Sequence, residues 1–154
     1  MLILGIDPGL TGALAFYDKG LDAITVRDMP IIRTRNKAHI SETLVVQLIR
    51  SMRPDVAVIE LIHALPKQGV TSMFNFGVGF GILRGVLASF DVPTHFMTPQ
   101  EWRRLARVVG PAGDKGASRL RAQQVFPGQC DQFSRPKDHG RADAALIVHA
   151  WLIR

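Results

Sequence analysis

The sequence predicts a mixed α/β fold, in which a five-stranded sheet has helices on both faces. Three short apolar segments follow one another near the N-terminus, and helical periodicities then alternate with two further apolar segments. With 154 residues the chain is long enough for one compact domain, residues 1–154, and too short for two lobes around a ligand cleft. A hydrophobic share of 47% and a charged share of 21% are typical of a globular protein.

The first three strands are expected to form an antiparallel meander. Residues 2–6 are one continuous apolar run, typical of a strand covered on both faces, and they lead into the glycine-rich turn at residues 7–12. The next two strands are predicted over residues 13–17 and 23–29. The polar and basic residues 33–39 predict a loop.

Helices and two more strands complete the predicted order. Apolar residues at helical spacing predict a helix from Ile40 to Met52, and Thr98-Pro99 is a helix-start signature, after which Trp102 is expected in the core. The other predicted elements are strands over 56–59 and 93–97, helices over 71–89, 115–125 and 138–152, and an irregular stretch over 127–136.

The fourth strand, residues 56–59, is expected to return parallel to the first through a right-handed crossover. The carboxyl ends of these two strands would then be neighbours, with Asp7 at one and Glu60 at the other. Open α/β sheets usually hold their ligands at this end.

Three carboxylates lie within apolar sequence. Asp7 and Glu60 follow apolar strands, and Asp143 shares the apolar face of the last helix. If the fold brings them together, they would repel one another without cations between them, so they predict a site for hard divalent metal ions. Each acid alone has another explanation: Asp7 could cap an ordinary turn, Glu60 could face solvent, and Asp143 could pair with Arg141.

The net charge of +6 is concentrated in the last third of the chain. Residues 1–101 hold nine Lys or Arg and nine Asp or Glu, whereas residues 102–154 hold ten and four. A basic segment of this kind predicts binding to nucleic acid, with a solvated basic surface as the alternative.

The sequence shows no sign of secretion or membrane insertion. It opens directly on the first strand, Cys130 is its only cysteine, and no apolar stretch is expected to reach the roughly 20 residues of a membrane span. We therefore expect a soluble, cytoplasmic protein without a disulfide and without a membrane partner.

Four segments, in this order along the chain, resemble the RuvC family of Holliday-junction resolvases. They are Gly5–Gly9, Glu60 at the end of its strand, Asp114–Ser118 and Arg141–Leu146, and the resemblance spans almost the whole chain. Three further segments are more similar to the phage-encoded branch of the family than to the cellular one: Phe74–Gly77, Pro99–Trp102 and Lys137–Arg141.

The resemblance implies a ribonuclease-H-like fold, a homodimer, and paired, metal-dependent hydrolysis of phosphodiesters in four-way double-stranded DNA junctions. It implies two Mg²⁺ ions per active site, with Mn²⁺ as a substitute, held by Asp7, Glu60 and Asp143 as catalytic residues. The similarity to phage members implies a phage-encoded enzyme that acts in the host cytoplasm. The sequence does not indicate whether it has a helicase partner.

A fourth metal ligand is less well defined by the resemblance. Cellular members place an acid or a histidine where this chain has Gly140. We favour His139 as the ligand and catalytic residue, since it lies four residues before Asp143 on roughly the same helical face. Asp138 is the next candidate, and it also suits the N-cap of the last helix.

Basic residues complete the predicted site. The resemblance matches Lys115 to a family lysine near the scissile phosphate, with a role in catalysis and DNA binding, and places Arg104 near another basic position. Arg119 in the same basic helix as Lys115 is also expected to bind DNA. His63 and Lys67, in the loop after the fourth strand, are expected near the exchange point of the junction.

Other functions fit parts of the sequence. The turn at residues 7–12 also resembles the first phosphate loop of actin-like ATPases and sugar kinases, but those folds need a second lobe. A junction-binding module without catalysis would account for the basic charge, yet it would gain nothing from three acids beside phosphate. A metal-dependent nuclease with a broader range of branched DNA is the nearest alternative.

Overall fold

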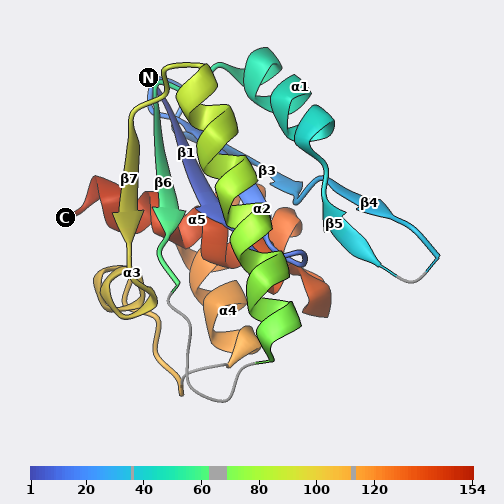
Figure 1. The fold of residues 1–154 in the computed structure, drawn as a ribbon. Helices are drawn as coiled ribbons and strands as arrows, with labels where there is room; N and C mark the ends of the chain where they lie inside the picture. Colours follow the sequence, from blue (N-terminus) through green and yellow to red (C-terminus); the bar gives the residue numbers. More distant parts are fainter. Residues whose placement is uncertain (36, 63–68, 112–113) are drawn as a thin grey trace.

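The computed structural model confirms the mixed α/β fold, with one five-stranded sheet between two layers of helices (Figure 1). It describes the chain except for residues 36, 63–68 and 112–113. The strand order is β3-β2-β1-β6-β7; β2 is antiparallel to both of its neighbours, whereas β6 is parallel to both of its own. The strands are β1 (Leu2–Asp7), β2 (Ala13–Asp18), β3 (Ala23–Asp28), β6 (Val56–Glu60) and β7 (Thr94–Met97).

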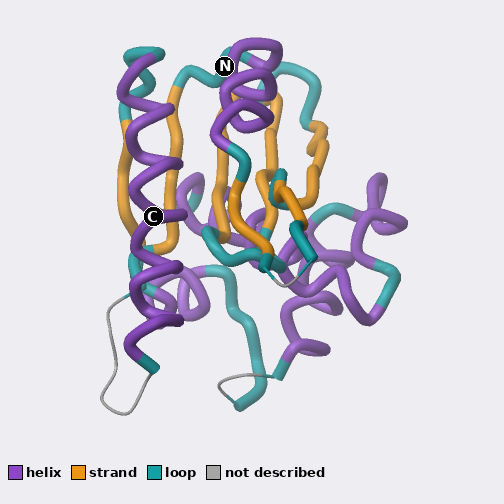
Figure 2. The backbone as a smooth tube through the Cα atoms, turned by 45° about the vertical axis from the view of Figure 1, so that its right-hand side comes forward, coloured by secondary structure: helices purple, strands orange, loops and turns teal. Residues whose placement is uncertain are grey.

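The helices cover both faces of the sheet, as predicted. In Figure 1, α2 lies in front of the sheet and α5 lies behind it, and Figure 2 shows the same layers from another side. One core cluster joins the sheet to α1 and α2, and the other joins it to α3, α4 and α5. The helices are α1 (Glu42–Met52), α2 (Val70–Ser89), α3 (Pro99–Leu105), α4 (Lys115–Val125), α5 (His139–Leu152) and the short 3₁₀ helices η1 (Pro127–Phe133) and η2 (Pro136–Asp138).

Three helices begin at side-chain caps that the sequence contains. The Ser41 hydroxyl accepts a hydrogen bond from the Leu44 amide, and Thr98 caps α3 in the same way. The Asp114 carboxylate accepts hydrogen bonds from the amides of Gly116 and Ala117 at the start of α4. These bonds satisfy amides that have no partner inside the helix, and so fix where each helix begins.

Alternation along the strands determines which way the strand-end carboxylates point. Ile3 and Val58 belong to the core cluster under α5, whereas Leu4 belongs to the cluster under α1 and α2. Residues two apart on a strand share a face. Asp7 and Glu60 therefore face the α5 side of the sheet.

The loop prediction for residues 33–39 is wrong in part. The chain forms a second, two-stranded sheet there, from β4 (Ile31–Arg33) and β5 (Ala38–Ile40), which projects from the domain in Figure 1. Ile31 pairs with Ile40 at its base, and the Ile40 side chain is buried under α2. The strands are too short and their outer residues too polar for alternation to indicate them.

The expectation that no apolar stretch reaches the length of a membrane span is also wrong. By length and composition α2 is long and apolar enough to cross a membrane, with 20 residues and a mean hydropathy of 1.3, and 22% of that segment is buried. Its inner side packs on the domain through Gly79, Leu83, Val86 and Leu87. Its outer side carries an exposed row at helical spacing, the α2 stripe: Phe74, Val78, Gly81, Gly85 and Ala88.

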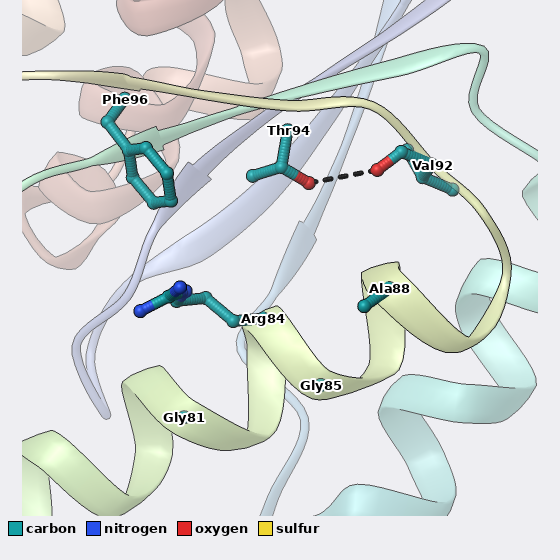
Figure 3. A pocket seen from close by; sticks show the side chains of 7 residues that line it. All are labelled: Gly81, Arg84, Gly85, Ala88, Val92, Thr94 and Phe96. Atoms are coloured by element: carbon teal, nitrogen blue, oxygen red, sulfur yellow. Dashed lines mark hydrogen bonds between the residues drawn. The ribbon is translucent and has the colours of Figure 1, made fainter.

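The α2 stripe continues into a groove beside the edge strand β7. Gly81, Gly85 and Ala88 line it on α2, and Thr94 and Phe96 line it on β7, around a volume of about 540 Å³ (Figure 3). The Arg84 guanidinium lies 5.5 Å from the centre of the Phe96 ring. The free side of α2 and the edge of the sheet thus form one continuous, mainly apolar surface.

Candidate active site

Asp7 and Glu60 lie side by side at the carboxyl ends of the two central strands, as predicted. The parallel pairing of β1 with β6 sets Ile6 opposite Ile59, so the next residue of each strand is the acid. The strand ends meet at the lower edge of the sheet in Figure 1. This edge is where parallel strands usually present ligand-binding groups.

The last helix brings Asp143 to the same place. α5 crosses so close to β1 that a Cβ on Gly5 would collide with the Ala144 carbonyl oxygen and would lie 2.6 Å from the Val148 side chain. Only glycine permits this approach. The Asp143 carboxylate lies close enough to the strand ends for its charge to raise the pKa of both Asp7 and Glu60, and we call Asp7, Glu60 and Asp143 the carboxylate cluster.

Burial raises the pKa of every member of the carboxylate cluster, and repulsion by a neighbouring carboxylate adds to it at Asp7 and Glu60. Burial is the larger cause for Asp7, and the charges of Glu60 and Asp143 add to it, so that its pKa rises to about 8. Burial likewise raises the pKa of Glu60 and of Asp143. The site therefore holds carboxylates whose ionised forms are only partly compensated by positive charge.

The donor set of the carboxylate cluster suits a hard divalent cation. The Oδ1 atom of Asp143 is buried and has no hydrogen-bond partner among the described residues, which is costly unless a ligand supplies one. Carboxylate oxygens are the ligands that Mg²⁺ and Mn²⁺ prefer. Within the described ranges no group of three or more His, Cys, Asp or Glu side chains is close enough to hold one ion, so the carboxylate cluster is not a preformed metal cage.

Trp102 holds Glu60 in place, a role that its sequence context did not reveal. The side chain is buried in the core, as predicted, and its indole Nε1–H donates a 2.8 Å hydrogen bond to Glu60 Oε1. This bond lowers the pKa of Glu60 and opposes the effect of burial. Trp102 thus fixes one carboxylate oxygen and leaves the other free.

Arg103, and not Arg104, is the basic residue that α3 brings to the carboxylate cluster. Its charge lowers the pKa of both Glu60 and Asp143, and one of its guanidinium nitrogens donates a 3.4 Å hydrogen bond to the hydroxyl of Ser118. The buried Ser118 hydroxyl also contacts Asp143 and lowers its pKa. Arg104 is exposed on the other side of α3. From the sequence, only the helical phase of α3 could have indicated which of these two adjacent arginines faces the carboxylate cluster.

His139 lies at the cluster, whereas Gly140 leaves no room for a side chain. His139, the first residue of α5, is partly exposed and its charge lowers the pKa of Asp143. A Cβ on Gly140 would collide with the Thr11 carbonyl oxygen and lie 3.1 Å from Asp7 Oδ2. The first turn of α5 therefore packs directly on the β1–β2 turn, and an acid at position 140 would not fit.

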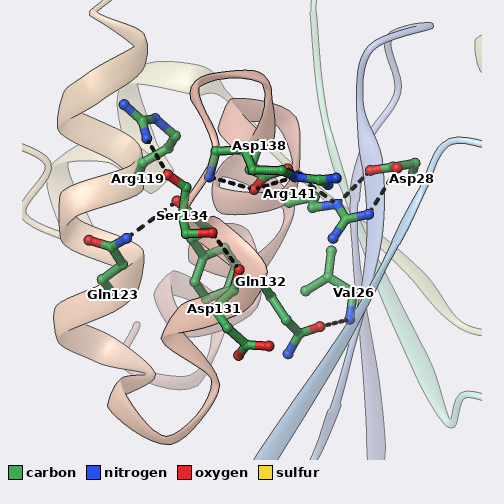
Figure 4. Close-up of polar contacts among 11 residues, drawn as sticks. Val26, Asp28, Arg119, Gln123, Asp131, Gln132, Ser134, Asp138 and Arg141 are labelled. Carbon is green, nitrogen blue, oxygen red and sulfur yellow. Dashed lines mark hydrogen bonds and ion pairs between the residues drawn. The ribbon is translucent and has the colours of Figure 1, made fainter.

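Asp138 is occupied by arginines and does not cap α5. Its side chain, 1% exposed, accepts hydrogen bonds from the Arg135 amide and guanidinium, the shortest of them 2.8 Å (Figure 4). Burial alone would raise the pKa of Asp138, but the bonds from Arg135 outweigh it and lower the pKa. The expected N-cap bond to α5 is absent. This pairing argues against Asp138 as a metal ligand.

Arg141 links the start of α5 to β3, an edge strand of the sheet. Its guanidinium forms a bidentate pair with Asp28 at the end of β3, at 2.6 and 2.9 Å, and lies 3.7 Å from Asp138 (Figure 4). The alternative pairing of Arg141 with Asp143 is therefore not formed. Bidentate arginine–carboxylate pairs are geometrically specific, so this pair helps to hold the helix that carries Asp143.

The remaining predicted DNA contacts are placed less fully. Lys115 is the first residue of α4, three residues before Ser118, and its side chain lies outside the described residues, as do His63 and Lys67. Arg119 is partly buried, and its guanidinium donates a 3.3 Å hydrogen bond to the Ser134 carbonyl oxygen. That bond joins α4 to the segment before η2.

Comparison with known proteins points in one direction. No protein-family model matches the chain. The crossover junction endodeoxyribonuclease RuvC of Mycobacterium ulcerans is 29% identical over 98% of this chain and 84% of its own length. That of Corynebacterium diphtheriae is 28% identical, over 96% of this chain and 93% of its own. The chain is a relative of RuvC.

Solved RuvC structures have the same fold. The Thermus thermophilus RuvC structure superposes with a TM-score of 0.66 and 16% identity, over 99% of this chain and 95% of that one. The structure of T. thermophilus RuvC in complex with a Holliday junction substrate superposes with a TM-score of 0.64, over 99% of this chain and 93% of that one. The five-stranded mixed sheet is thus the ribonuclease-H-like sheet that the RuvC resemblance implies.

Proposed function

We propose that this chain is a metal-dependent endodeoxyribonuclease that resolves four-way DNA junctions by hydrolysing two phosphodiesters. The observation that carries the proposal is the carboxylate cluster: three acids from three separate elements, buried together with only partial compensation by positive charge. The similarity to RuvC over nearly the whole chain supports the substrate. The variant Asp143→Asn, which keeps the shape and removes the charge, should bind a four-way junction without cutting it.

Asp7, Glu60 and Asp143 would hold two Mg²⁺ ions, with His139 as the fourth ligand. When bound, two such ions would activate the attacking water and stabilise the leaving oxygen. The chain's own residues orient the ligands: Trp102 fixes one oxygen of Glu60. Asp143 Oδ1, buried and without a described partner, is the atom most in need of a cation.

Basic groups around the carboxylate cluster would hold the scissile phosphate. The Nη2 atom of Arg103 is buried without a hydrogen-bond partner in the described part of the chain. A guanidinium at this place would bind a phosphate oxygen beside the metal ligands. Lys115, the first residue of α4, is proposed to contact the same phosphate.

Two other functions remain distinct from this proposal. A nuclease with broader specificity would use the same carboxylate cluster, so it differs only in the DNA that it cuts. A binding module without catalysis would gain nothing from three buried acids near phosphate, because their ionised forms repel it and their burial is costly. Junction resolution and broader nuclease activity differ only in the DNA that is cut, so cleavage of matched DNA substrates distinguishes them.

Substituting Trp102 by Phe should weaken the metal site. The change removes the indole N–H that holds Glu60. Residues that orient metal ligands typically contribute 10- to 100-fold in affinity or activity, so we expect the Mg²⁺ concentration for half-maximal cleavage to rise by about 10-fold or more. A magnesium titration of cleavage measures this.

The matched control is Trp151→Phe, which makes the same change on the partly exposed ring that contacts His95. It should leave the magnesium midpoint where it is in the wild type. A Trp102→Phe midpoint equal to that of the control would remove Trp102 from the support of the site.

We propose further that two copies associate through the α2 stripe, because paired cuts require two active sites. The stripe is exposed and apolar, and Gly81, Gly85 and Ala88 would let a second helix approach closely. Phe74 is 70% exposed and Val78 46%, and they lie in one contiguous apolar surface, which is typical of interaction sites. The groove beside β7 would extend the contact.

Substituting Val78 by Glu should therefore produce a monomer. A buried carboxylate at the centre of the α2 stripe would cost several kcal/mol in the dimer and almost nothing in the free chain. Light scattering after size exclusion measures the mass, and the control Leu21→Glu places the same charge on an apolar residue that is 77% exposed in the β2–β3 turn. An unchanged dimer in Val78→Glu would contradict this interface.

A further inference from the structure

The β4–β5 hairpin carries a run of positive charge that the candidate active site does not use. Between Asp28 and Glu42 the sequence has three Lys or Arg and no acid. Arg33, Arg35 and Lys37 are all exposed. Within the described part of the chain, none of these three side chains forms an ion pair with an Asp or Glu.

The base of the hairpin is fixed to the domain. Ile40 is 2% exposed, and a Cβ on Gly79 of α2 would lie 2.9 Å from its Cδ1 atom. The Ser41 amide donates a 2.9 Å hydrogen bond to the Pro30 carbonyl oxygen, which joins the two ends of the hairpin at its base. The hairpin therefore has a defined origin and direction.

Beyond this base the hairpin contributes little to the folded core. Its turn is closed by a 2.8 Å hydrogen bond from the Thr34 amide to the Lys37 carbonyl oxygen, and the Ile32 side chain is 43% exposed. Two-stranded hairpins are only marginally stable by themselves, and repulsion among three cations makes this one less so. A polyanion that neutralised the cations would stabilise it.

The hairpin leaves the sheet at the end where the carboxylate cluster lies. The register across the strands sets Asp7 opposite Ala13, and Ala13 opposite Asp28, so Asp28 lies at the same edge as Asp7. The chain then turns into β4, and Figure 1 shows β4 and β5 projecting away from the sheet. With three residues per strand the hairpin extends roughly 10 Å.

We propose that the β4–β5 hairpin is an arm that binds the phosphate backbone of a duplex arm flanking the cut site. Arg33, Arg35 and Lys37 supply the charge, and the fixed base holds them at a set distance from the carboxylate cluster. The contact is independent of base sequence, because cations recognise phosphates and not base edges. The proposal rests on the proposed function for the identity of the DNA.

The test is junction binding by a variant with Arg33, Arg35 and Lys37 all changed to Gln, measured without metal so that no cutting occurs. Each lost phosphate contact lowers the slope of log K against log salt by about 0.9, so we expect the slope to fall by about 2 to 3. The matched control changes Lys19, Arg50 and Arg53 to Gln; all three are exposed, and none lies in the hairpin. It should keep the wild-type slope.

An unchanged slope in the hairpin variant would overturn the proposal, and so would an equal fall in both variants, since that would reflect net charge alone. Shortening the duplex arms supplies a second readout: the wild type should lose its advantage over the hairpin variant once the DNA is too short to reach it. A wild-type protein that binds junctions but never cuts them would refute the proposed function and leave this binding comparison valid.

Discussion

Changing Asp7 to Asn should abolish cleavage while junction binding is kept or becomes tighter. The substitution removes a metal ligand and, at the same time, a negative charge beside the phosphate. Loss of roughly 4 kcal/mol of transition-state stabilisation corresponds to about a 10³-fold slower reaction. Single-turnover cleavage and a binding titration on the same junction measure the two effects separately.

The control for Asp7→Asn is Asp91→Asn. Asp91 is exposed in the turn after α2 with a φ of 54°, a conformation that asparagine also adopts, so the same change of charge occurs away from the site. Cleavage by this control should match the wild type. Weakened binding by Asp7→Asn together with retained cutting would contradict its role as a ligand.

The stability of the metal-free protein should fall as the pH rises from about 4 to about 8. The pKa of Asp7 is about 8 in the fold against 3.8 for the ordinary group, so over this range the folded state holds a proton that the unfolded state has lost. The free energy of unfolding then decreases with pH, and the raised pKa values of Glu60 and Asp143 act in the same direction. We expect a fall of roughly 2 to 4 kcal/mol, which urea unfolding at several pH values measures.

Magnesium should reverse this loss at high pH. Binding at a hundred times the dissociation constant would add about 2.7 kcal/mol, and less would be gained at pH 5, where Asp7 holds its proton. Asp7→Asn serves as the control, because its metal-free stability should vary less with pH. A metal-free wild type that becomes more stable from pH 5 to 8 would contradict the description of the carboxylate cluster.

Much of the fold was predictable because apolar periodicity and strand order determine it. The carboxylates of Asp7 and Glu60 follow apolar runs whose parallel pairing could be inferred, so their meeting at one edge followed from topology. Asp143 was recognisable because it lies on the apolar face of a helix that had to cover the sheet. These are long-range consequences of local patterns.

Other features depended on contacts that no local pattern reports. Trp102 satisfies every requirement of a core residue, and only its distance to Glu60 shows the second role of its indole. Arg103 and Arg104 differ by one position, so a small error in helix phase exchanges them. Asp138 is a residue type that commonly caps helices, but its carboxylate is bound by the guanidinium of Arg135 instead.

The most direct test is cleavage of a mobile four-way junction by the wild-type protein beside linear and forked duplexes of the same sequence, with Mg²⁺, with Mn²⁺ and with chelator. We predict paired, metal-dependent nicks at symmetric positions in the junction, and none in the linear or forked DNA. Equal cutting of all three DNAs would contradict junction resolution and favour a broader nuclease. Tight junction binding without cutting under any metal condition would contradict the proposed enzyme itself.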